Sequence, residues 1–432
     1  MTSENLYRSL DNILSQSPPA LPADALAAFV RTCFEQGPRC LRIVEEHGAP
    51  IYLLETSILR ARAAQFRAAF EKVLDPVGFY YAMKSNNHPA VVRSLIDAGY
   101  GIDVSSGLEL KTALDLGAGD IVFSGPGKTH EELRLAAAHN DRVVVLLDSF
   151  GELSRLSDAA AEQRRTVRCG VRLAVNTNGL WRKFGIARED LTAFWQTVDQ
   201  HPRVDLVGLQ FHSSWNTSAQ PQIELIENLG KTLRHLPPAR RQALTFIDIG
   251  GGYWPEQGEW LLPRSTARGR LLEALGAPAD APNVHFCVPS MPIETFASQI
   301  ADAVHRHLSP VAPCRICLEP GRWICNDAMH LLISVVDKKA PDLVITDAGT
   351  NAVGWERFES DYFPVLNLTR PALQERACHI LGSLCTPHDV WGTMYFGESI
   401  EPGDILMIPT QGAYTYSLRQ NFIKPLPPVV VV

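Results

Sequence analysis

At four places in the sequence, a chemically active residue follows an apolar run. Lys84 follows the first of these runs, and His212 follows a later one. A third run ends in three consecutive glycines, residues 250–252, and the last is followed by Glu319 and Arg322. These residues offer an amine, an imidazole, exposed backbone amides, a carboxylate and a guanidinium. What they can do together depends on whether the fold brings them to one place.

Two of these signals have a specific chemical meaning. A lysine at the end of a buried strand is partly desolvated, which favours the neutral amine that forms Schiff bases. Consecutive glycines leave backbone N–H groups uncovered by side chains, which suits a phosphate group. Each signal also has an ordinary explanation, namely a solvated lysine, a flexible turn, or a structural ion pair of Glu319 with Arg322. The Gly-x-Gly-x-x-Gly spacing of a dinucleotide-binding fold is absent after the first strand.

The elements that must position these residues are short β-branched apolar runs separated by helical segments. Such alternation predicts parallel βαβ units, and eight units predict closure into a (β/α)8 barrel. Functional groups of a barrel lie at the C-terminal ends of its strands, which is where the active residues fall. The eight runs are Val77–Met83, Gly101–Val104, Ile121–Ser124, Val143–Leu147, Val167–Ala174, Leu206–Phe211, Leu244–Ile249 and Ile316–Leu318.

The sequence changes character after Trp323, where strand-like runs alternate with turns rich in Pro, Gly and Asp. This predicts a C-terminal β-domain. We therefore divide the chain into an N-terminal helical extension and lead-in to the β-domain (residues 1–50), the barrel (51–310), and the last barrel strand with the β-domain (311–432). The stretch from Trp254 to Pro292 contains several Pro and Gly residues and is predicted to be a long barrel insertion.

Composition excludes several classes of function. The 432 residues carry 40 Lys and Arg against 47 Asp and Glu, a net charge of −7 with no basic cluster, so we expect neither nucleic acid nor membrane as a partner. The N-terminus lacks the pattern of a signal peptide, which predicts a cytoplasmic protein. Nine scattered cysteines do not form a disulfide framework. The pair Cys314 and Cys317 lies in an alternating apolar run, so we expect strand packing and no metal site.

In their order along the chain, the motifs resemble those of the fold-type III pyridoxal 5′-phosphate (PLP) decarboxylases, which include ornithine, arginine and diaminopimelate decarboxylases. The resemblance extends over residues 50–422. It implies that Lys84, in Tyr81-Ala82-Met83-Lys84, holds PLP as an imine, and that Glu319 pairs with the pyridine nitrogen. It implies further cofactor contacts from Asp103, Glu109, Arg172, His212, Ser214, Gly250, Gly251, Gly252, Arg322 and Tyr414.

The resemblance continues into the predicted β-domain. The segment that ends in Cys385 is similar to one whose cysteine reaches the active site of a neighbouring subunit. This implies a homodimer with shared active sites, in which Cys385 is the catalytic acid that returns a proton to Cα. The loop from Asp347 to Asn351 resembles the substrate-facing loop of diaminopimelate decarboxylases.

Two departures from the family pattern concern the substrate. Ornithine and diaminopimelate decarboxylases carry Asp or Glu after the cysteine, to hold the distal ammonium of the substrate, but this chain has Thr386. Asp347 and Asp389 are candidate replacements for that missing charge. Arg357 has two interpretations: it binds a distal carboxylate of the substrate, or it is a solvated arginine on a loop. In addition, the loop after His212 has Ser214 and Trp215 where the family pattern has Gly and Ser, which adds bulk at the pocket and removes the expected serine contact to the phosphate.

The resemblance predicts PLP-dependent decarboxylation of a small-molecule substrate, either an amino acid or an amino-acid conjugate. The segment from Cys385 to Asp389 resembles decarboxylases of siderophore and other specialised pathways, which favours a conjugate with a neutral or anionic distal part. Three alternatives remain open: a diaminopimelate decarboxylase, an amino-acid racemase, and a non-catalytic regulatory homologue. Glu319 opposes the racemase, and retention of the active residues opposes the regulatory homologue.

Overall fold

The chain divides into two units, and one of them is a closed barrel of eight parallel strands. The computed structural model describes residues 3–15, 18–176, 178–277, 284–354 and 362–432. The barrel unit comprises Thr56–Glu256 and Met291–Cys325. Its strands, in order, are β2 (Val77–Ala82), β3 (Gly101–Val104), β4 (Ile121–Phe123), β5 (Val143–Leu147), β6 (Val167–Arg172), β7 (Val204–Gln210), β8 (Phe246–Asp248) and β11 (Arg315–Leu318). The expected (β/α)8 barrel is confirmed.

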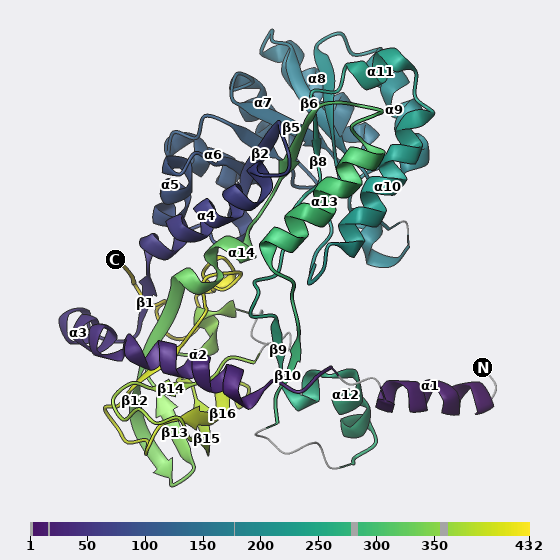
Figure 1. The fold of residues 1–432 in the computed structure, drawn as a ribbon. Coiled ribbons are helices and arrows are strands. Elements are labelled where there is room, and N and C mark those ends of the chain that lie inside the picture. The colour runs from purple at the N-terminus through teal and green to yellow at the C-terminus, as the bar shows by residue number, and fades with distance from the viewer. Residues whose placement is uncertain (1–2, 16–17, 177, 278–283, 355–361) are drawn as a thin grey trace. The chain divides into compact units, whose positions relative to one another are not determined.

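Helices cover the outside of the barrel (Figure 1). Several begin at a capping residue, because the side chains of Ser106, Thr129 and Ser149 accept hydrogen bonds from backbone N–H groups of the first turn. The helices are α4 (Thr56–Glu71), α5 (Pro89–Asp97), α6 (Gly107–Asp115), α7 (His130–Ala138), α8 (Phe150–Glu162), α9 (Leu191–Val198), α10 (Gln220–Arg234), α11 (Pro238–Gln242), α13 (Ile293–His307) and the short α14 (Arg322–Cys325).

The barrel strands are buried along most of their length, and β5 is buried at every position. Tyr80, Val122, Leu146 and Cys317 form a packed cluster that joins four strands. Cys317 is thus part of the core, as strand packing predicts. Because a barrel interior of this kind is filled by side chains, the chemistry is left to the residues that follow the strands.

The second unit contains a mixed sheet of eight strands in the order β13-β15-β16-β14-β17-β12-β1-β18. It comprises Met1–Glu55, Gln257–Ser290 and Asn326–Val432, in so far as these are described. The β-domain expected after Trp323 is therefore present, and its sheet also takes in residues 51–54. The strands are β1 (Ile51–Leu54), β12 (Met329–Ala340), β13 (Leu343–Thr346), β14 (Leu366–Asn367), β15 (Glu375–Leu381), β16 (Val390–Phe396), β17 (Ile405–Ile408) and β18 (Val429–Val431).

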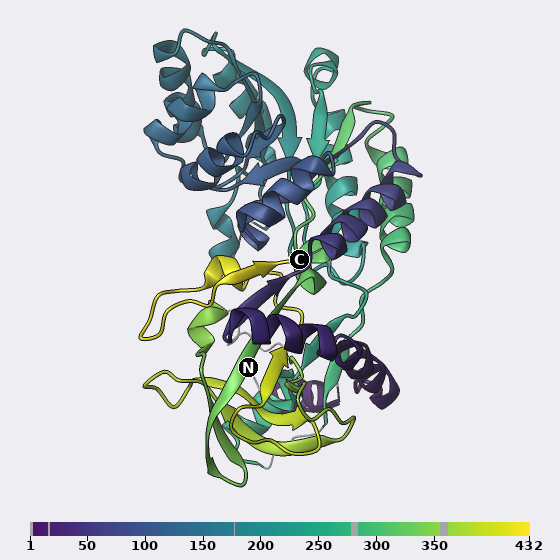
Figure 2. The same ribbon diagram turned by 90° about the vertical axis from the view of Figure 1, so that its left-hand side faces the viewer.

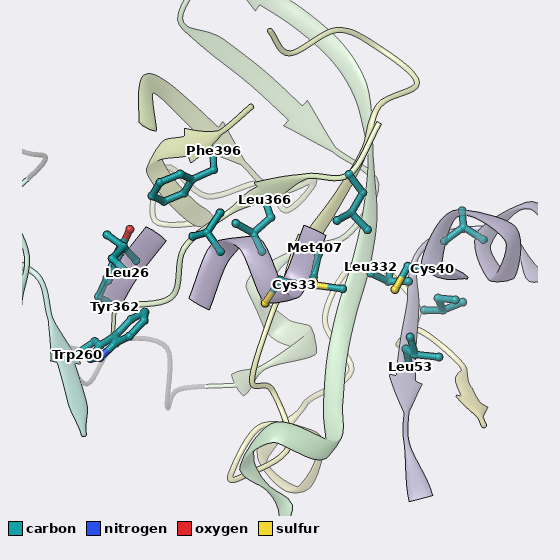
Figure 3. Packing of buried hydrophobic residues seen from close by; sticks show 14 residues of the cluster. Leu26, Cys33, Cys40, Leu53, Trp260, Leu332, Tyr362, Leu366, Phe396 and Met407 are labelled. Carbon is teal, nitrogen blue, oxygen red and sulfur yellow. The ribbon is translucent and has the colours of Figure 1, made fainter. Parts of the chain in front are cut away.

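The core of this unit lies between its sheet and two N-terminal helices, α2 (Ala23–Glu35) and α3 (Gly37–His47). In Figure 2 the purple N-terminal helices lie across the green and yellow strands of the sheet. Leu26, Val30 and Cys33 of α2 are spaced at helical intervals and are buried on one face. Figure 3 shows this face among residues of the sheet such as Leu366 and Met407.

The segment between Trp254 and Pro292 interrupts the barrel in sequence, but residues 257–290 pack in the second unit. It contains a hairpin of β9 (Glu259–Leu261) and β10 (Phe286–Val288), with α12 (Ala267–Ala274) between the strands. The ring of Trp260 stacks on that of Tyr362, with 6.2 Å between centroids. A further helix, α1 (Ser3–Ser15), precedes α2. None of the helices in the described ranges has the length and apolar character to cross a lipid bilayer.

Candidate active site

Lys84 lies directly after β2, in a single turn of 3-10 helix, and contacts the neighbouring strand. Because Ala82 and Asp103 are partners in the parallel β2–β3 ladder, the lysine side chain lies beside the end of β3. Its Nζ atom is 2.9 Å from Oδ2 of Asp103, which is fully buried. The hydroxyl of Ser124 donates a hydrogen bond to the other oxygen of this carboxylate. Lys84 itself is about one-third exposed, at 34%, so its amine is held in place and remains accessible.

Glu319 follows the last strand, β11, and is 1% exposed. Its Oε2 atom is 3.3 Å from Nδ1 of His212, and its Oε1 atom accepts a hydrogen bond from Nε2 of Gln210 at 3.3 Å. The same nitrogen of His212 is 3.3 Å from the backbone nitrogen of Gly251. An Nδ1–H tautomer donates to Glu319, whereas an Nε2–H tautomer accepts from Gly251. The end of β7 thus links the carboxylate to the glycine turn.

Glu319 is ionised although it is buried. Burial disfavours its carboxylate, but the hydrogen bond from His212 and nearby positive charges outweigh burial and lower the pKa to about 2. These charges belong to Lys84 and Arg172. Burial also lowers the pKa of His212, which favours the neutral imidazole. The site therefore places a permanent anion next to a neutral ring.

Two other buried carboxyl groups, those of Asp103 and Asp248, lie at the ends of β3 and β8. Burial raises the pKa of Asp103 and, much further, that of Asp248, and the charge of Glu319 raises both. Asp248 also has a local role, because its Oδ1 atom accepts a hydrogen bond from the backbone N–H of Gly250 at 2.8 Å.

The glycine turn after β8 has no room for side chains. A Cβ atom at Gly251 would lie 2.0 Å from the carbonyl oxygen of Glu319, and one at Gly252 would lie 2.2 Å from that of Ser213. Gly250 and Gly252 also have positive φ angles, of 71° and 80°. Ser214 borders the turn, since its Cα atom is 3.0 Å from the position of a Gly252 Cβ. The turn is therefore a tightly packed backbone surface and not a flexible linker.

Two buried amides that the motifs did not indicate hold this turn from behind. Nδ2 of Asn216 and Nε2 of Gln222 both donate to the carbonyl oxygen of Gly251, at 3.0 Å and 3.4 Å. Gln222 occupies a position on the buried face of α10, in helical register with Ile226 and Leu229. A polar residue in an otherwise apolar stripe is a signal that could have revealed it.

The other cofactor candidates of the barrel unit lie around this centre. Glu109 accepts a hydrogen bond from the backbone N–H of Ser105 at 2.6 Å, and burial raises its pKa. The guanidinium of Arg172, at the end of β6, lies 4.5 Å from the ring centroid of Phe184. Arg322 is the first residue of α14, directly after the Glu319 segment. The structure thus brings together the candidates that follow β2, β3, β6, β7, β8 and β11.

The substrate candidates lie in the second unit, where the two candidate carboxylates are already bonded. Both oxygens of Asp347 accept hydrogen bonds from Ser334, one from its backbone N–H at 2.9 Å and one from its hydroxyl at 2.5 Å. Asp389 is buried and accepts from the backbone N–H groups of Thr350 and Leu384, both at 2.7 Å. These bonds favour a structural role for both aspartates over the substrate contact expected from the sequence.

The loop between β15 and β16 exposes Cys385, whereas Thr386 borders a cavity of about 180 Å³ in this unit. The described residues of its lining include the amide of Asn351, the imidazole of His388 and the ring of Phe422, but no carboxylate. Tyr414 belongs to the same unit and has a positive φ of 56°. Arg357 lies outside the described residues. The described residues contain no cluster of His, Cys, Asp and Glu side chains arranged to hold a metal ion.

Two family models match this chain and together cover residues 58–412, which include parts of both units. Residues 58–326 match "Pyridoxal-dependent decarboxylase, pyridoxal binding domain", and residues 322–412 match "Pyridoxal-dependent decarboxylase, C-terminal sheet domain". A diaminopimelate decarboxylase of Methanothermobacter thermautotrophicus is 27% identical over 420 residues, which cover 92% of this chain and 89% of the relative. An L-glutamyl-[BtrI acyl-carrier protein] decarboxylase of Niallia circulans is 23% identical over 393 residues, which cover 85% of this chain and 84% of the relative.

Solved structures share this fold. The diaminopimelate decarboxylase of Methanocaldococcus jannaschii in complex with L-lysine has a TM-score of 0.75 at 24% identity and covers 91% of this chain and 89% of its own. The lysine/ornithine decarboxylase of Vibrio vulnificus with putrescine has a TM-score of 0.72 at 23% identity, and the match covers 92% of this chain and 98% of that structure's chain.

Proposed function

The chain belongs to the family of pyridoxal-dependent decarboxylases, and from this premise we propose that it decarboxylates an amino-acid conjugate whose distal part is neutral or anionic. The enzyme class and the PLP cofactor follow from the family. The residues present fit this cofactor: an accessible amine at Lys84, an ionised buried carboxylate at Glu319, and a glycine turn with tightly packed backbone. The Nζ atom of Lys84 would hold the cofactor, the Glu319 carboxylate would face its ring nitrogen, and the turn would receive its phosphate.

Bound PLP supplies a carbonyl that captures the substrate amine and a ring that accepts the electron pair left on Cα when CO2 departs. The chain's own residues prepare that step. Asp103 holds the Lys84 amine, and Glu319, as an anion, keeps a proton on the ring nitrogen. Neutral His212 offers a flat surface beside Glu319. Cys385 is assigned the final step, in which its thiol gives a proton to Cα.

The observation that carries the substrate proposal is that, among the described residues, no carboxylate lines the cavity that Thr386 borders. An aliphatic ammonium that leaves water needs an anionic partner to offset its desolvation. Thr386 offers only a hydroxyl. Asp347 already accepts a hydrogen bond from Ser334, and Asp389 already accepts hydrogen bonds from the backbone of Thr350 and Leu384. The described lining of the neighbouring cavity offers hydroxyl, amide and imidazole groups, which suit a neutral or anionic distal group.

A conjugated substrate has a precedent among the relatives. The name of the Niallia circulans protein states that it acts on a glutamyl group carried by an acyl-carrier protein. A diamino acid that is joined to a larger group through its side-chain amine has lost the distal ammonium, and a glutamyl group has none. A product of specialised metabolism, such as a siderophore precursor, is therefore the substrate class we favour.

Changing Thr386 to Asp is expected to shift preference toward free ornithine and lysine. The missing charge-assisted hydrogen bond is worth about 1.5–3 kcal/mol. Wild-type kcat/KM for these two diamino acids should therefore be roughly ten- to a hundred-fold below that for the native substrate. Released CO2 should be measured with ornithine, lysine, diaminopimelate and citrate conjugates of amino acids. Thr386→Val, which removes the hydroxyl without adding charge, is the matched control. Wild-type kcat/KM of about 10⁴ M⁻¹s⁻¹ or more with ornithine or lysine would refute the proposal.

A second candidate is a diaminopimelate decarboxylase. Relatives with that name cover about nine-tenths of this chain, for example 92% for the Methanothermobacter protein. The loop from Asp347 to Asn351 also resembles theirs. Against it stand Thr386 and the hydrogen bonds that already occupy Asp347. In the same substrate panel, this candidate predicts that diaminopimelate outperforms every conjugate.

The proposal includes a homodimer with shared active sites, in which Cys385 completes the site of the partner subunit. Separately inactive Lys84→Ala and Cys385→Ala chains, mixed and allowed to exchange subunits, should then regain activity. Random exchange leaves about a quarter of the sites intact. Sedimentation should first verify the dimer, and differently tagged chains should verify exchange. If exchange is complete and activity does not return, Cys385 does not act across subunits.

A further inference from the structure

A stack of two tryptophans and an arginine lies beside the glycine turn, and no motif explains it. The guanidinium carbon of Arg322 is 4.4 Å from the ring centroid of Trp254. On Trp254 lies the ring of Trp215, with 6.3 Å between centroids and 23° between planes. These geometries are within the ranges of cation–π and aromatic stacking contacts. Trp215 follows β7, Trp254 follows β8 and Arg322 follows β11. The ends of these strands carry the phosphate-site candidates.

The backbone holds the two tryptophans in this arrangement. The N–H of Asn216 donates to the carbonyl oxygen of Gly252 at 2.9 Å, and the N–H of Trp254 donates to that of Asn216 at 3.1 Å. Asn216 and Tyr253 thereby form a parallel bridge, and Trp215 and Trp254 are the residues adjacent to it on the two chain segments. The stack is thus built onto the glycine turn itself.

Trp215 is in an unfavourable state that needs an explanation. Its φ angle is 55°, in the left-handed region that bulky residues avoid, and its large ring is 51% exposed. Such strain persists where the surroundings impose it and is common at functional sites. The family pattern expects a serine at this position, whose hydroxyl would contact the phosphate. Tryptophan replaces that small donor with a flat ring.

We propose that Trp215 and Trp254 are positioning residues that hold the Arg322 guanidinium toward the cofactor phosphate. A guanidinium stacked on an aromatic face is fixed in orientation, so less conformational freedom is lost when its N–H groups bind phosphate oxygens. In this site the stack takes the place of the serine hydroxyl that the family pattern expects at position 215. The proposal rests on the phosphate role of Arg322 and does not depend on which substrate is decarboxylated.

The test compares PLP with pyridoxal, which has the same ring and carbonyl but no phosphate. Each is titrated into apoenzyme and followed by its visible absorbance. In Trp254→Leu we expect the Kd for PLP to rise roughly 5- to 30-fold, the range of a desolvated cation–π contact, while that for pyridoxal changes less than about 2-fold. Trp254→Phe, which keeps an aromatic face, should recover part of the loss. Equal changes for both ligands, or none for PLP, would overturn the proposal.

A double-mutant cycle shows whether the tryptophan acts through the arginine. Trp254→Leu should weaken PLP binding in the wild-type background and have little further effect in Arg322→Ala, because the group that it positions is already gone. An undiminished effect in Arg322→Ala would refute the positioning role. Thermal unfolding of each apoenzyme shows whether the variant is folded.

Trp215→Asn provides a second variant that keeps the fold, since the side chain is half exposed and asparagine tolerates a positive φ. We expect a smaller rise in the Kd for PLP than with Trp254→Leu, because Trp215 acts through Trp254. The matched control is Trp181→Asn, which removes another tryptophan of similar exposure, one that contacts Phe184. If both variants bind PLP like wild type, Trp215 has no part in the stack's function.

Discussion

Replacing Lys84 with alanine is expected to abolish turnover and the visible absorbance of bound cofactor. The Lys84 amine is accessible and is held by Asp103 at 2.9 Å, which is why we propose it as the group that forms a covalent bond with PLP. Without it the cofactor has no covalent anchor, and the substrate amine cannot enter by exchanging with a lysine. We expect kcat to fall at least about 10³-fold, as for the loss of other covalent nucleophiles.

A second lysine, Lys128, is an alternative candidate for the covalent bond to PLP, so the assignment to Lys84 can be tested against it. Lys128 also follows a barrel strand, but it is 2% exposed. Its Nζ atom donates to the carbonyl oxygen of Leu146 at 2.7 Å and to Glu152 at 3.2 Å. Its amine is therefore buried and already bonded to two acceptors. Borohydride reduction of the holoenzyme followed by peptide mapping should find the cofactor on Lys84, and finding it on Lys128 would contradict the assignment. Lys111→Ala, on the exposed face of α6, is the matched control and should leave activity unchanged.

The barrel could be predicted from sequence because its strands are buried on both faces. Runs such as Val143–Leu147 therefore stand out as uninterrupted apolar segments, and all five of these residues are buried. The segment from 257 to 290 is different. Its hairpin packs in the second unit through contacts such as that of His285 with Glu375, at 3.0 Å. These partners are 90 residues apart in sequence, and no local pattern predicts such a pairing.

Within the site, the residues that the sequence could indicate are those placed by a strand end. Lys84 and Glu319 follow apolar runs, and their neighbours could be inferred from motif order. Asn216 has no such signal, and Gln222 stands out only as a polar residue in an apolar helix stripe. The role of both amides depends on the direction of one carbonyl group, that of Gly251. Asp389 illustrates the opposite problem. Its type suggested a substrate ligand, but only coordinates reveal that backbone amides already occupy its oxygens.

Changing Glu319 to glutamine is expected to lower kcat by about 10²- to 10³-fold, the usual effect of removing one preorganised electrostatic contact. Glutamine keeps the size of the side chain but not its charge. The pyridine nitrogen would then lose the anion that keeps it protonated, and the ring would accept electrons less well. Because Lys84 remains, the visible absorbance of bound PLP should persist, which separates this effect from loss of the cofactor.

The pH dependence of this effect follows from the charge state of Glu319. Its pKa is lowered to about 2, so the wild-type carboxylate stays ionised at any pH from 5 to 9. The ratio of wild-type to Glu319→Gln activity should therefore be flat across that range, whereas a proton-transfer role would give a ratio that varies with pH. Glu55→Gln is the matched control, because Glu55 is also buried. Hydrogen bonds that its carboxylate accepts from His330 and Arg39 lower its pKa, and this effect outweighs that of burial, which raises the pKa. That variant should lose stability in urea but keep its kcat. A Glu319→Gln enzyme with kcat within about 3-fold of wild type would show that the ring needs no anion here, and the argument against a racemase would fall with it.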